Sequence, residues 1–228
     1  CQQGTTGTLI YDRLKPLLAE HRIDVAIVTT HSQARIVAKH ITPLIEAGIP
    51  VITTCEELLY PFNTQPELAK ELDELAKQHG TAILGTGVNP GFLMDYLPIC
   101  ATGLAESISH ITVNRIQDAS QRRLPFQHKI GAGLSLDEFN NKVDKGTLRH
   151  VGLKESVHLI ANKLQFNLSK VTETISPVEK LHVIQGVHQQ AHGYVGNTEV
   201  IKLNFLAAMN QQTPEDRIIV RGNPSFEL

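Results

Sequence analysis

The stretch Leu84-Gly-Thr-Gly-Val-Asn-Pro-Gly-Phe-Leu-Met-Asp95 is the most informative part of the chain for its fold. It follows a short apolar run at residues 81–84, which predicts a buried strand, and it leads into an apolar helical pattern. A strand, a glycine-rich turn and a helix in this order bring backbone N–H groups to the carboxyl edge of a sheet, where open α/β sheets bind ligands. Such turns also occur as plain connections, so this stretch alone leaves both interpretations open.

A second turn of this kind lies one strand–helix unit earlier, at Val51-Ile-Thr-Thr-Cys-Glu-Glu57. Residues 25–28 form a continuous apolar run, typical of a strand with both faces covered. Ser32 is predicted to cap the helix that follows, and Thr64-Gln-Pro-Glu67 is predicted to form a capping box for the next one. Strands and helices alternate about every twenty-five residues, which predicts right-handed crossovers and a parallel sheet.

The pattern changes after Gly103. An alternating run at residues 109–116 predicts a half-exposed strand, and a polar, basic loop at residues 118–129 follows it. Two helical patterns then precede long alternating runs beyond Ser169, which predict antiparallel strands. We therefore expect an α/β protein: a partial doubly wound (Rossmann-like) parallel sheet in residues 1–104, followed by an α+β domain with a mostly antiparallel sheet in residues 105–228.

Composition excludes several classes of partner. The 228 residues carry 21 basic and 23 acidic side chains, a net charge of −2, so there is no basic footprint for nucleic acid or an anionic membrane. The apolar runs are too short to span a bilayer. Three cysteines at wide spacings fit a reducing compartment better than a disulfide framework. We expect a soluble, cytoplasmic protein.

Glu56 and Glu57 are the candidate catalytic residues, because they stand just past a strand end, where sheets deliver functional groups. In a pocket, the neighbouring charge and partial burial would raise the pKa of one carboxyl and suit it to take or hold a proton. The alternative is that the pair simply begins a solvated helix. Cys55 has no histidine near it in the sequence, which favours a small buried thiol over a nucleophile.

Two further groups of side chains are candidates for binding. Hydroxyls at strand ends can lie along a nucleotide, although threonine is also common there for structural reasons; these are Thr29, Thr30, Thr53 and Thr54. Basic side chains in the loop after the first long strand can bind a substrate carboxylate or only face solvent; these are Arg122, Arg123 and Lys129.

His188 and His192 are four residues apart, a spacing that can suggest zinc. They lie in an alternating strand pattern, where such positions are roughly 13 Å apart. That separation is too large for one metal ion, and no other Cys or His spacing supports a site. We predict no metal site.

Four motifs in order resemble those of 2,4-diaminopentanoate dehydrogenases and the related native amine dehydrogenases, which have a dihydrodipicolinate-reductase-like dinucleotide-binding domain. They are Val51-Ile-Thr-Thr-Cys-Glu-Glu-Leu58, Leu84-Gly-Thr-Gly-Val-Asn-Pro-Gly-Phe92, Asp118-Ala-Ser-Gln-Arg-Arg-Leu-Pro-Phe-Gln-His-Lys-Ile-Gly131 and His150-Val-Gly-Leu-Lys-Glu-Ser156. The resemblance extends over nearly the whole chain.

This resemblance implies a reversible oxidative deamination with NAD or NADP as cofactor, an amine or ketone as substrate, and ammonia as the second product. The essential glutamate of the family falls in the Thr-Cys-Glu-Glu segment, so Glu56 or Glu57 would deprotonate the amine or ammonia, with Glu56 favoured. The four threonines would line the cofactor, and Asn89, Pro90 and Gly91 would border the nicotinamide. The basic loop would bind the carboxylate of a diamino acid.

The sequence also departs from the family in two ways. The loop from Arg122 to Gly131 lacks the His-His, Lys and Ser-Gly-Thr pattern of dihydrodipicolinate reductases, which argues against their exact reaction. The glycine-rich first unit of the nucleotide-binding domain is not in this sequence, so NAD cannot be distinguished from NADP. Two alternatives remain open: a dihydrodipicolinate-reductase-like reductase, and a non-catalytic remnant that keeps only a dimerisation domain. The long strands after Ser169 predict a homodimer.

Overall fold

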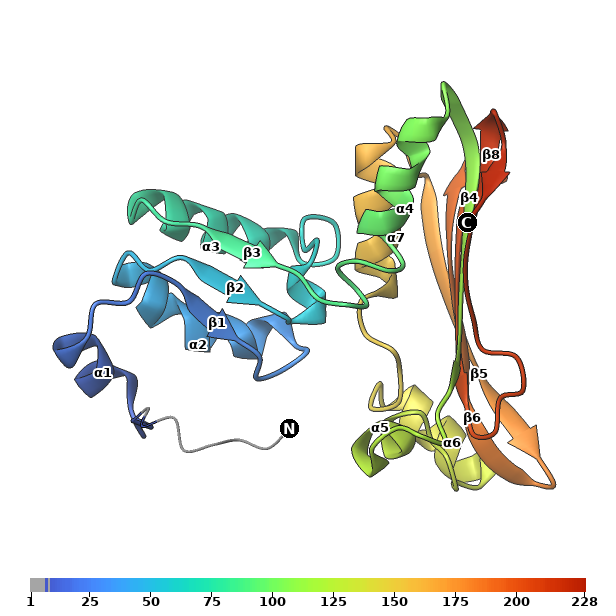
Figure 1. Ribbon diagram of the computed structural model, residues 1–228, viewed down its shortest axis with the longest axis horizontal. Coiled ribbons are helices and arrows are strands. Elements are labelled where there is room, and N and C mark those ends of the chain that lie inside the picture. The colour runs from blue at the N-terminus through green and yellow to red at the C-terminus, as the bar shows by residue number, and fades with distance from the viewer. Residues whose placement is uncertain (1–6, 8) are drawn as a thin grey trace.

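The computed structural model describes residue 7 and residues 9–228, which form two sheets with separate hydrophobic cores (Figure 1). The elements in chain order are α1 (Leu14–Glu20), β1 (Ala26–Val28), α2 (Ala34–Glu46), β2 (Val51–Thr53), the 3-10 helix η1 (Glu56–Leu58), α3 (Pro66–Gln78), β3 (Ile83–Gly85), α4 (Tyr96–Ala101), the 3-10 helix η2 (Thr102–Leu104), β4 (Ser107–Asp118), α5 (Leu124–Lys129), α6 (Leu136–Asp144), α7 (Leu153–Lys163), β5 (Lys170–Lys180), β6 (Val183–Val195), β7 (Thr198–Ala208), β8 (Glu215–Asn223) and β9 (Phe226–Glu227).

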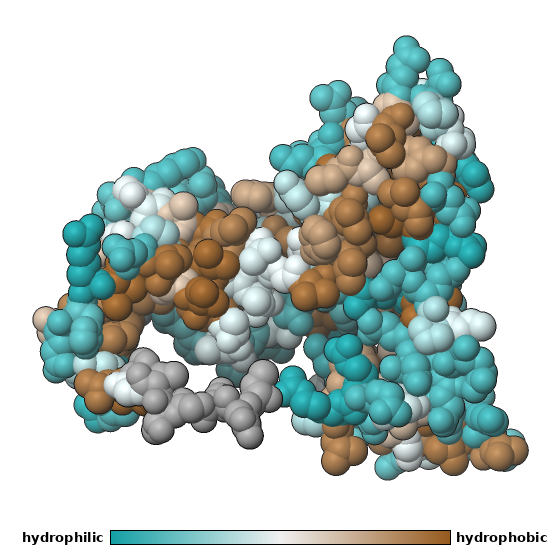
Figure 2. Space-filling view, viewed as in Figure 1, coloured by the Kyte–Doolittle hydropathy of each residue, from teal (hydrophilic) through white to brown (hydrophobic). Residues whose placement is uncertain are grey.

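The first sheet is small and parallel, with strand order β1-β2-β3. Its register aligns Ile27 with Ile52 and Ile52 with Leu84 across the three strands. Ile27 and Leu84 are 69% and 57% exposed, while the buried core of this region lies mainly in α2, β2 and α3. Apolar side chains therefore gather on the visible side of this region in Figure 2.

The second sheet is large and mostly antiparallel, with strand order β5-β6-β7-β4-β8-β9. Within this sheet, β4–β7 is the only parallel pair among the described residues, and the other four strand pairs are antiparallel. In Figure 1 this sheet is seen nearly edge-on, and α4, α5, α6 and α7 all lie on the side that faces the small sheet. The predicted fold class, a partial parallel sheet followed by a mostly antiparallel one, is confirmed.

Each sheet has its own core. The first cluster packs α2 and α3 residues such as Ile41, Ile45 and Leu72 against Val51. The second contains inward residues of β4, β6 and β7 together with α7, and it also takes in Met94. The segment around α4 therefore packs with the second sheet, although it precedes the predicted division at residue 104. No helix in the described ranges is both long and apolar enough to cross a membrane.

Both predicted helix caps are wrong, and at α2 a tertiary contact explains the difference. Helix α2 begins at Ala34, and the Ala34 amide donates to Glu57 Oε2 at 2.9 Å, so a distant carboxylate replaces the Ser32 hydroxyl. Helix α3 begins at Pro66 without a side-chain cap, and Thr64 Oγ1 is buried without a hydrogen-bond partner among the described residues. A carboxylate stabilises a helix N-terminus even when it comes from a distant part of the chain. The residues next to the helix in the sequence give no sign of such a partner.

The loop predicted at residues 118–129 contains a helix, α5. Pro125 stands in its first turn, where a missing N–H has no cost. Gln127 Nε2 donates to the carbonyl groups of Ala119, Ser120 and Arg122, which closes the preceding turn. This helix gives Lys129 a fixed position at its last residue, whereas Arg122 and Arg123 stay in the turn before it.

Candidate active site

The carboxyl ends of all three parallel strands meet at one edge of the small sheet, as the alternation predicts. β1 leads into Thr29 and Thr30, β2 leads into η1 with its two glutamates, and β3 leads into the glycine-rich turn. Residues of the second region close over this edge through contacts to Glu56, Glu57 and Asn89. The candidate active site is the place where the two regions meet.

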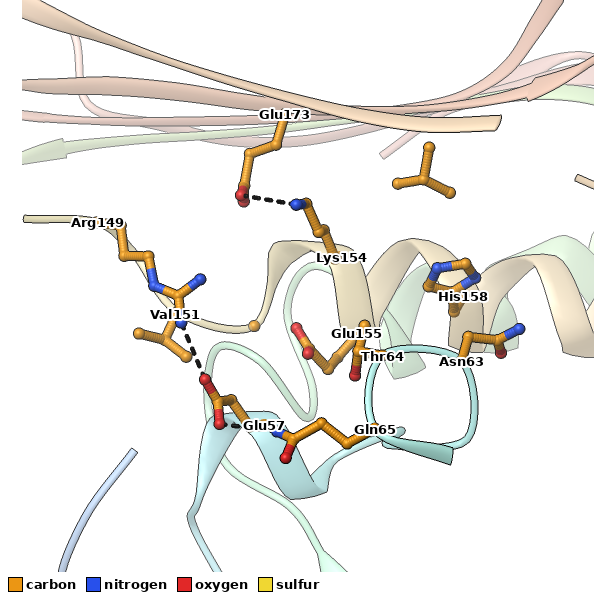
Figure 3. A pocket seen from close by; sticks show the side chains of 12 residues that line it. Glu57, Asn63, Thr64, Gln65, Arg149, Val151, Lys154, Glu155, His158 and Glu173 are labelled. Carbon is orange, nitrogen blue, oxygen red and sulfur yellow. Dashed lines mark hydrogen bonds and ion pairs between the residues drawn. The ribbon is translucent and has the colours of Figure 1, made fainter. Parts of the chain in front are cut away.

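Glu57 uses both of its carboxylate oxygens to hold structure together. Oε2 accepts from the Ala34 amide and from Gln65 Nε2, each at 2.9 Å. Oε1 accepts from Arg149 of the second region, also at 2.9 Å, and the Glu57 side chain is 14% exposed (Figure 3). Glu57 therefore joins α2, the loop before α3 and the second region at one point.

Glu56 has a different environment. One oxygen lies 3.7 Å from Lys129 Nζ, and this ion pair also links the two regions. No hydrogen bond ties the Glu56 carboxylate to another side chain in the described structure, and 21% of its side chain is exposed. The charge of Lys129 offsets that of the carboxylate while leaving its oxygens able to exchange a proton with a bound molecule.

The Asn89–Gly91 turn packs directly against the second region. Asn89 Nδ2 lies 3.1 Å from His150 Nε2, and Pro90 is buried. Gly91 adopts a φ of 122°, and a Cβ there would lie 2.2 Å from the Gly87 amide nitrogen, so only glycine fits. Asp95 links this turn to α7, because its Oδ2 accepts a hydrogen bond from the Gly91 amide at 2.9 Å and another from Ser156 Oγ at 2.7 Å.

His150 is held rigidly on the large sheet. Its ring stacks on Phe205 with centroids 4.2 Å apart, and Gln189 accepts from its amide at 2.7 Å and donates to its carbonyl at 2.8 Å. Burial, reinforced by the positive charges of Lys129 and Arg115, lowers the pKa of His150 to about 3. The imidazole is therefore neutral near neutral pH and can share a hydrogen bond with Asn89 without adding charge to the site.

Arg115 and His150 are functional candidates that the sequence analysis did not identify. Arg115 is 8% exposed in the middle of β4, next to Phe205 in the register, and it contacts Asp216 at 3.4 Å. Burial lowers its pKa, and the charge of Asp216 opposes that effect. The alternation of β4 offered a signal, because Ile111, Val113 and Arg115 share one buried face, where an arginine requires an explanation.

The predicted threonines do not share one role. Thr53 is fully buried, and its hydroxyl donates to the Val28 carbonyl and accepts from the Cys55 amide, so it stabilises the strand ends. Thr30 lies 3.0 Å from His40 Nδ1. Thr29 and Thr54 are exposed at the sheet edge, where a ligand could reach their hydroxyls.

The three basic residues of the predicted loop also lie in different environments. Lys129 reaches Glu56, whereas the Arg122 guanidinium lies over the Phe126 ring, 4.7 Å from its centroid. Arg122 lines a different depression, together with Asp118 and Glu215. Arg123 is exposed next to α5. Of the three, the structure brings only Lys129 to the carboxylate at the strand end.

Cys55 is a buried structural thiol. It is 1% exposed, and its Sγ donates to the Ser32 carbonyl at 3.2 Å. Burial raises the pKa of the thiol to about 12, so the reactive thiolate is not populated at neutral pH. The interpretation of Cys55 as a small buried residue is confirmed. His192 faces Glu199 on the large sheet, and no metal-binding cluster of three His, Cys, Asp or Glu side chains occurs in the described part of the chain.

The site has features that fit the amide-bearing ring of a nicotinamide cofactor. Asn89 Oδ1 is buried at the sheet edge and has no hydrogen-bond partner among the described residues. A buried acceptor without a partner is costly, and an N–H donor from a carboxamide group would satisfy it. The exposed Thr29 and Thr54 hydroxyls lie at the ends of the two neighbouring strands. The donor and acceptor set is thus compatible with such a cofactor.

Comparisons with known proteins identify the family. Residues 92–228 match the model of the 2,4-diaminopentanoate dehydrogenase C-terminal domain. A 2,4-diaminopentanoate dehydrogenase from Acetoanaerobium sticklandii is 32% identical over 247 residues, which cover 99% of this chain and 69% of that protein. The chain belongs to the 2,4-diaminopentanoate dehydrogenase family. This membership confirms the interpretation of the chain as a nicotinamide-dependent oxidoreductase of the amine dehydrogenase group.

Solved structures support the fold. An amine dehydrogenase from Mycobacterium smegmatis superposes with a TM-score of 0.80 at 19% identity, covering 96% of this chain and 69% of that one. The WlbA dehydrogenase from Bordetella pertussis, in complex with NADH and UDP-GlcNAcA, gives a TM-score of 0.59 at 14% identity, covering 98% of this chain and 60% of that one. The arrangement of a parallel sheet followed by a larger sheet is therefore shared with dehydrogenases.

Proposed function

We propose that the protein catalyses the reversible oxidative deamination of 2,4-diaminopentanoate or a related amine, with Glu56 as the proton acceptor. The observation that carries this proposal is the placement of Glu56: a carboxylate at a strand end, next to the Asn89–Gly91 turn, with Lys129 as its single ion-pair partner in the described structure. A bound oxidised nicotinamide supplies the acceptor for two electrons and for the hydrogen of the amine-bearing carbon.

Glu56 acts on the nitrogen of the substrate. It takes a proton from the substrate ammonium, because only the neutral amine has the lone pair that drives loss of hydrogen from the adjacent carbon. The resulting C=N bond is hydrolysed by water, which yields the ketone and ammonia. In the reverse direction Glu56 takes the proton from ammonium, which makes ammonia available as the nucleophile.

Glu57 is proposed to position Glu56 and not to transfer protons itself. Its oxygens are engaged by the Ala34 amide, Gln65 and Arg149, so accepting a proton would disrupt contacts that join the two regions. His150 holds Asn89 from the other side. These contacts fix both sides of the cleft at the geometry that the reaction needs.

For the carboxylate of an amino-acid substrate we propose Lys129 and Arg115. Both lie near His150 closely enough to lower its pKa, so positive charge converges on one part of the cleft. Arg115 offers a two-pronged donor on a rigid strand, and its partner Asp216 is largely exposed and able to yield to a ligand. Arg122 and Arg123 are not needed for this role.

The reaction is tested with the full-length protein. NAD(P)H formation is followed with NAD+ and NADP+ separately, using 2,4-diaminopentanoate and a simple alkyl amine without a carboxylate. Turnover with release of ammonia is expected, and Arg115→Met should raise the KM of the diamino acid more than that of the alkyl amine. Absence of NAD(P)H formation with both amines and both cofactors contradicts the proposal.

We further propose a homodimer formed through the face of the large sheet that carries no helix in Figure 1. That face carries polar side chains that already contact one another, including His188 with Asn204 and Asn204 with Asn114. Light scattering should give twice the mass of one chain. Replacing Asn204 by Arg should shift the mass toward the monomer, and a monomeric unmodified protein contradicts this part of the proposal.

A further inference from the structure

A polar cavity lies between the two regions, with Glu57 in its lining. It measures about 420 Å³ and is lined by the loop before α3, by α7 and by β5 (Figure 3). Its charged lining residues are Glu57, Glu155 and Glu173 on the acidic side and Arg149 and Lys154 on the basic side. The reaction proposed above does not use this space.

Most of the charges in this cavity are paired. Arg149 pairs with Glu57 at 2.9 Å, and Lys154 pairs with Glu173 at 3.7 Å. Glu155 has no ion-pair partner among the described residues, although it is only 6% exposed. Burial raises its pKa, and the neighbouring charges of Glu57 and Glu173 add to that effect. The cavity therefore contains one buried carboxyl whose negative charge is not balanced.

The Thr64 hydroxyl provides a second, independent observation. Thr64 Oγ1 is buried, and the Glu155 carboxyl is its one neighbouring acceptor among the described residues of the cavity, at a looser geometry than a standard hydrogen bond. It lies beside the Glu155 carboxyl in Figure 3, close enough to lower the pKa of that carboxyl. The Glu155 carboxyl receives only its own backbone N–H and the Thr64 hydroxyl, and no cation pairs with it in the described structure. Both groups have lone pairs left for a small molecule that donates several hydrogen bonds.

The cavity borders a second groove, and at Gly152 it lies close to Glu56. A neighbouring groove of about 490 Å³ shares Asn63 and His158 with it. Gly152 forms part of the opposite wall, and a Cβ on Gly152 would lie 2.3 Å from Pro90 Cγ and 3.2 Å from Glu56 Cβ. Gly152 thus lies both in the cavity wall and next to the Glu56 side chain.

We propose that this cavity is an ammonium-binding site, in which Glu155 balances the charge and Thr64 accepts an N–H. The inference rests on the proposed function, because ammonium is what deamination releases and what amination consumes. Glu57 and Glu173 already pair with Arg149 and Lys154, so the one carboxylate left without a cation among the described lining residues, Glu155, matches one monovalent cation. A divalent metal requires more anionic ligands, and the described residues contain no group of three that could hold one.

Ammonium binding is measured directly, without relying on turnover. The thermal unfolding midpoint of the protein is followed as ammonium chloride rises at constant ionic strength, with sodium, potassium or tetramethylammonium chloride as replacements. Unmodified protein should gain roughly 3 to 6 °C when ammonium exceeds its dissociation constant about tenfold. Glu155→Gln should lose this gain, Glu155→Asp should keep a smaller one, and the exposed control Glu74→Gln should keep all of it.

Three outcomes overturn the proposal. An undiminished ammonium effect in Glu155→Gln places the binding elsewhere. An equal gain with potassium makes the cavity a general cation site. The third outcome is the absence of a midpoint shift with ammonium in the unmodified protein. The measurement reports stability and not turnover. If the protein is inactive but still binds ammonium through Glu155, the proposed reaction fails while this site stands.

Discussion

The two sheets contribute to the site in different ways. The strands of the small sheet are three residues long, and Ile27 and Leu84 on one face are exposed. Strands β4 to β8 of the large sheet are 9 to 13 residues long and contain fully buried residues such as Ile201 and Leu203. The proposed reactive groups come from the short strand ends, and the long sheet provides the stable structure against which they pack.

This difference shows why neither region contains the site alone. Glu56, Glu57 and Asn89 belong to the small sheet, and each has its partner in the second region: Lys129, Arg149 and His150 respectively. The Glu56–Lys129 ion pair and the Asn89–His150 contact both form only when the two regions touch. The chemistry therefore depends on how firmly this contact is made.

The largest expected difference between the two regions is in stability. Leu203→Ala removes a fully buried side chain from the large sheet and should lower the free energy of unfolding by about 3 kcal/mol. Ile27→Ala in the chain of residues 1–228 changes a side chain that is 69% exposed, so the cost should stay within about 0.5 kcal/mol. Urea denaturation of both variants measures this, and equal costs would contradict the contrast.

The contact between the regions is tested at Gly152. Its φ of 104° and the closeness of Pro90 exclude a side chain, so Gly152→Ala should cost roughly 1–3 kcal/mol and loosen the cleft. Gly196 at the β6–β7 turn is a matched control, because its φ is also positive but nothing lies within 4 Å of an added Cβ. If Gly196→Ala costs as much as Gly152→Ala, backbone strain and not the contact between regions explains the effect.

His150 predicts a pH dependence of stability that belongs to the large sheet. Its folded pKa of about 3 lies below the ordinary value of 6.5, so between these values the unfolded chain binds a proton that the folded chain does not. Stability should therefore fall as pH drops from about 6.5 toward about 3, by up to about 1.4 kcal/mol per pH unit from this residue. His150→Gln should remove that part of the slope in denaturation curves between these pH values, and an unchanged slope would show that His150 titrates normally.

The smallest effect concerns the thiols. Cys55 is buried with a pKa raised to about 12, whereas Cys100 is exposed. In a protein with Cys1 replaced by serine, a thiol reagent at neutral pH should label Cys100 quickly and Cys55 only on unfolding. Mass spectrometry of the labelled peptides checks this. Rapid labelling of Cys55 would mean that the small sheet opens readily.

The sequence predicts the placement of the strand-end residues well, because that placement depends on local order. A strand followed by Thr54, Cys55 and two glutamates must place those residues at the carboxyl edge of a parallel sheet. The glycine-rich turn is predicted for the same reason. The alternating runs after Ser169 likewise predict the large sheet, since period two is a property of each strand on its own.

The partners of those groups could not be predicted, because they come from distant parts of the chain. Glu57 and Ala34 are 23 residues apart, and Glu57 and Arg149 are 92 apart. Local spacing favoured Ser32 as the cap of α2, yet the carboxylate of Glu57 takes that place. Only the folded structure distinguishes Glu56, which keeps free oxygens, from Glu57, whose oxygens are engaged.

The central claim is that Glu56 handles the proton and Glu57 holds the two regions together. It is tested most directly by measuring kcat and the free energy of unfolding for Glu56→Gln and Glu57→Gln in parallel. We expect Glu56→Gln to lower kcat about a thousandfold with stability unchanged within about 0.5 kcal/mol. Glu57→Gln should cost roughly 1–3 kcal/mol of stability and retain far more of kcat. The reverse pattern, a stable but inactive Glu57→Gln beside an active Glu56→Gln, would contradict the account.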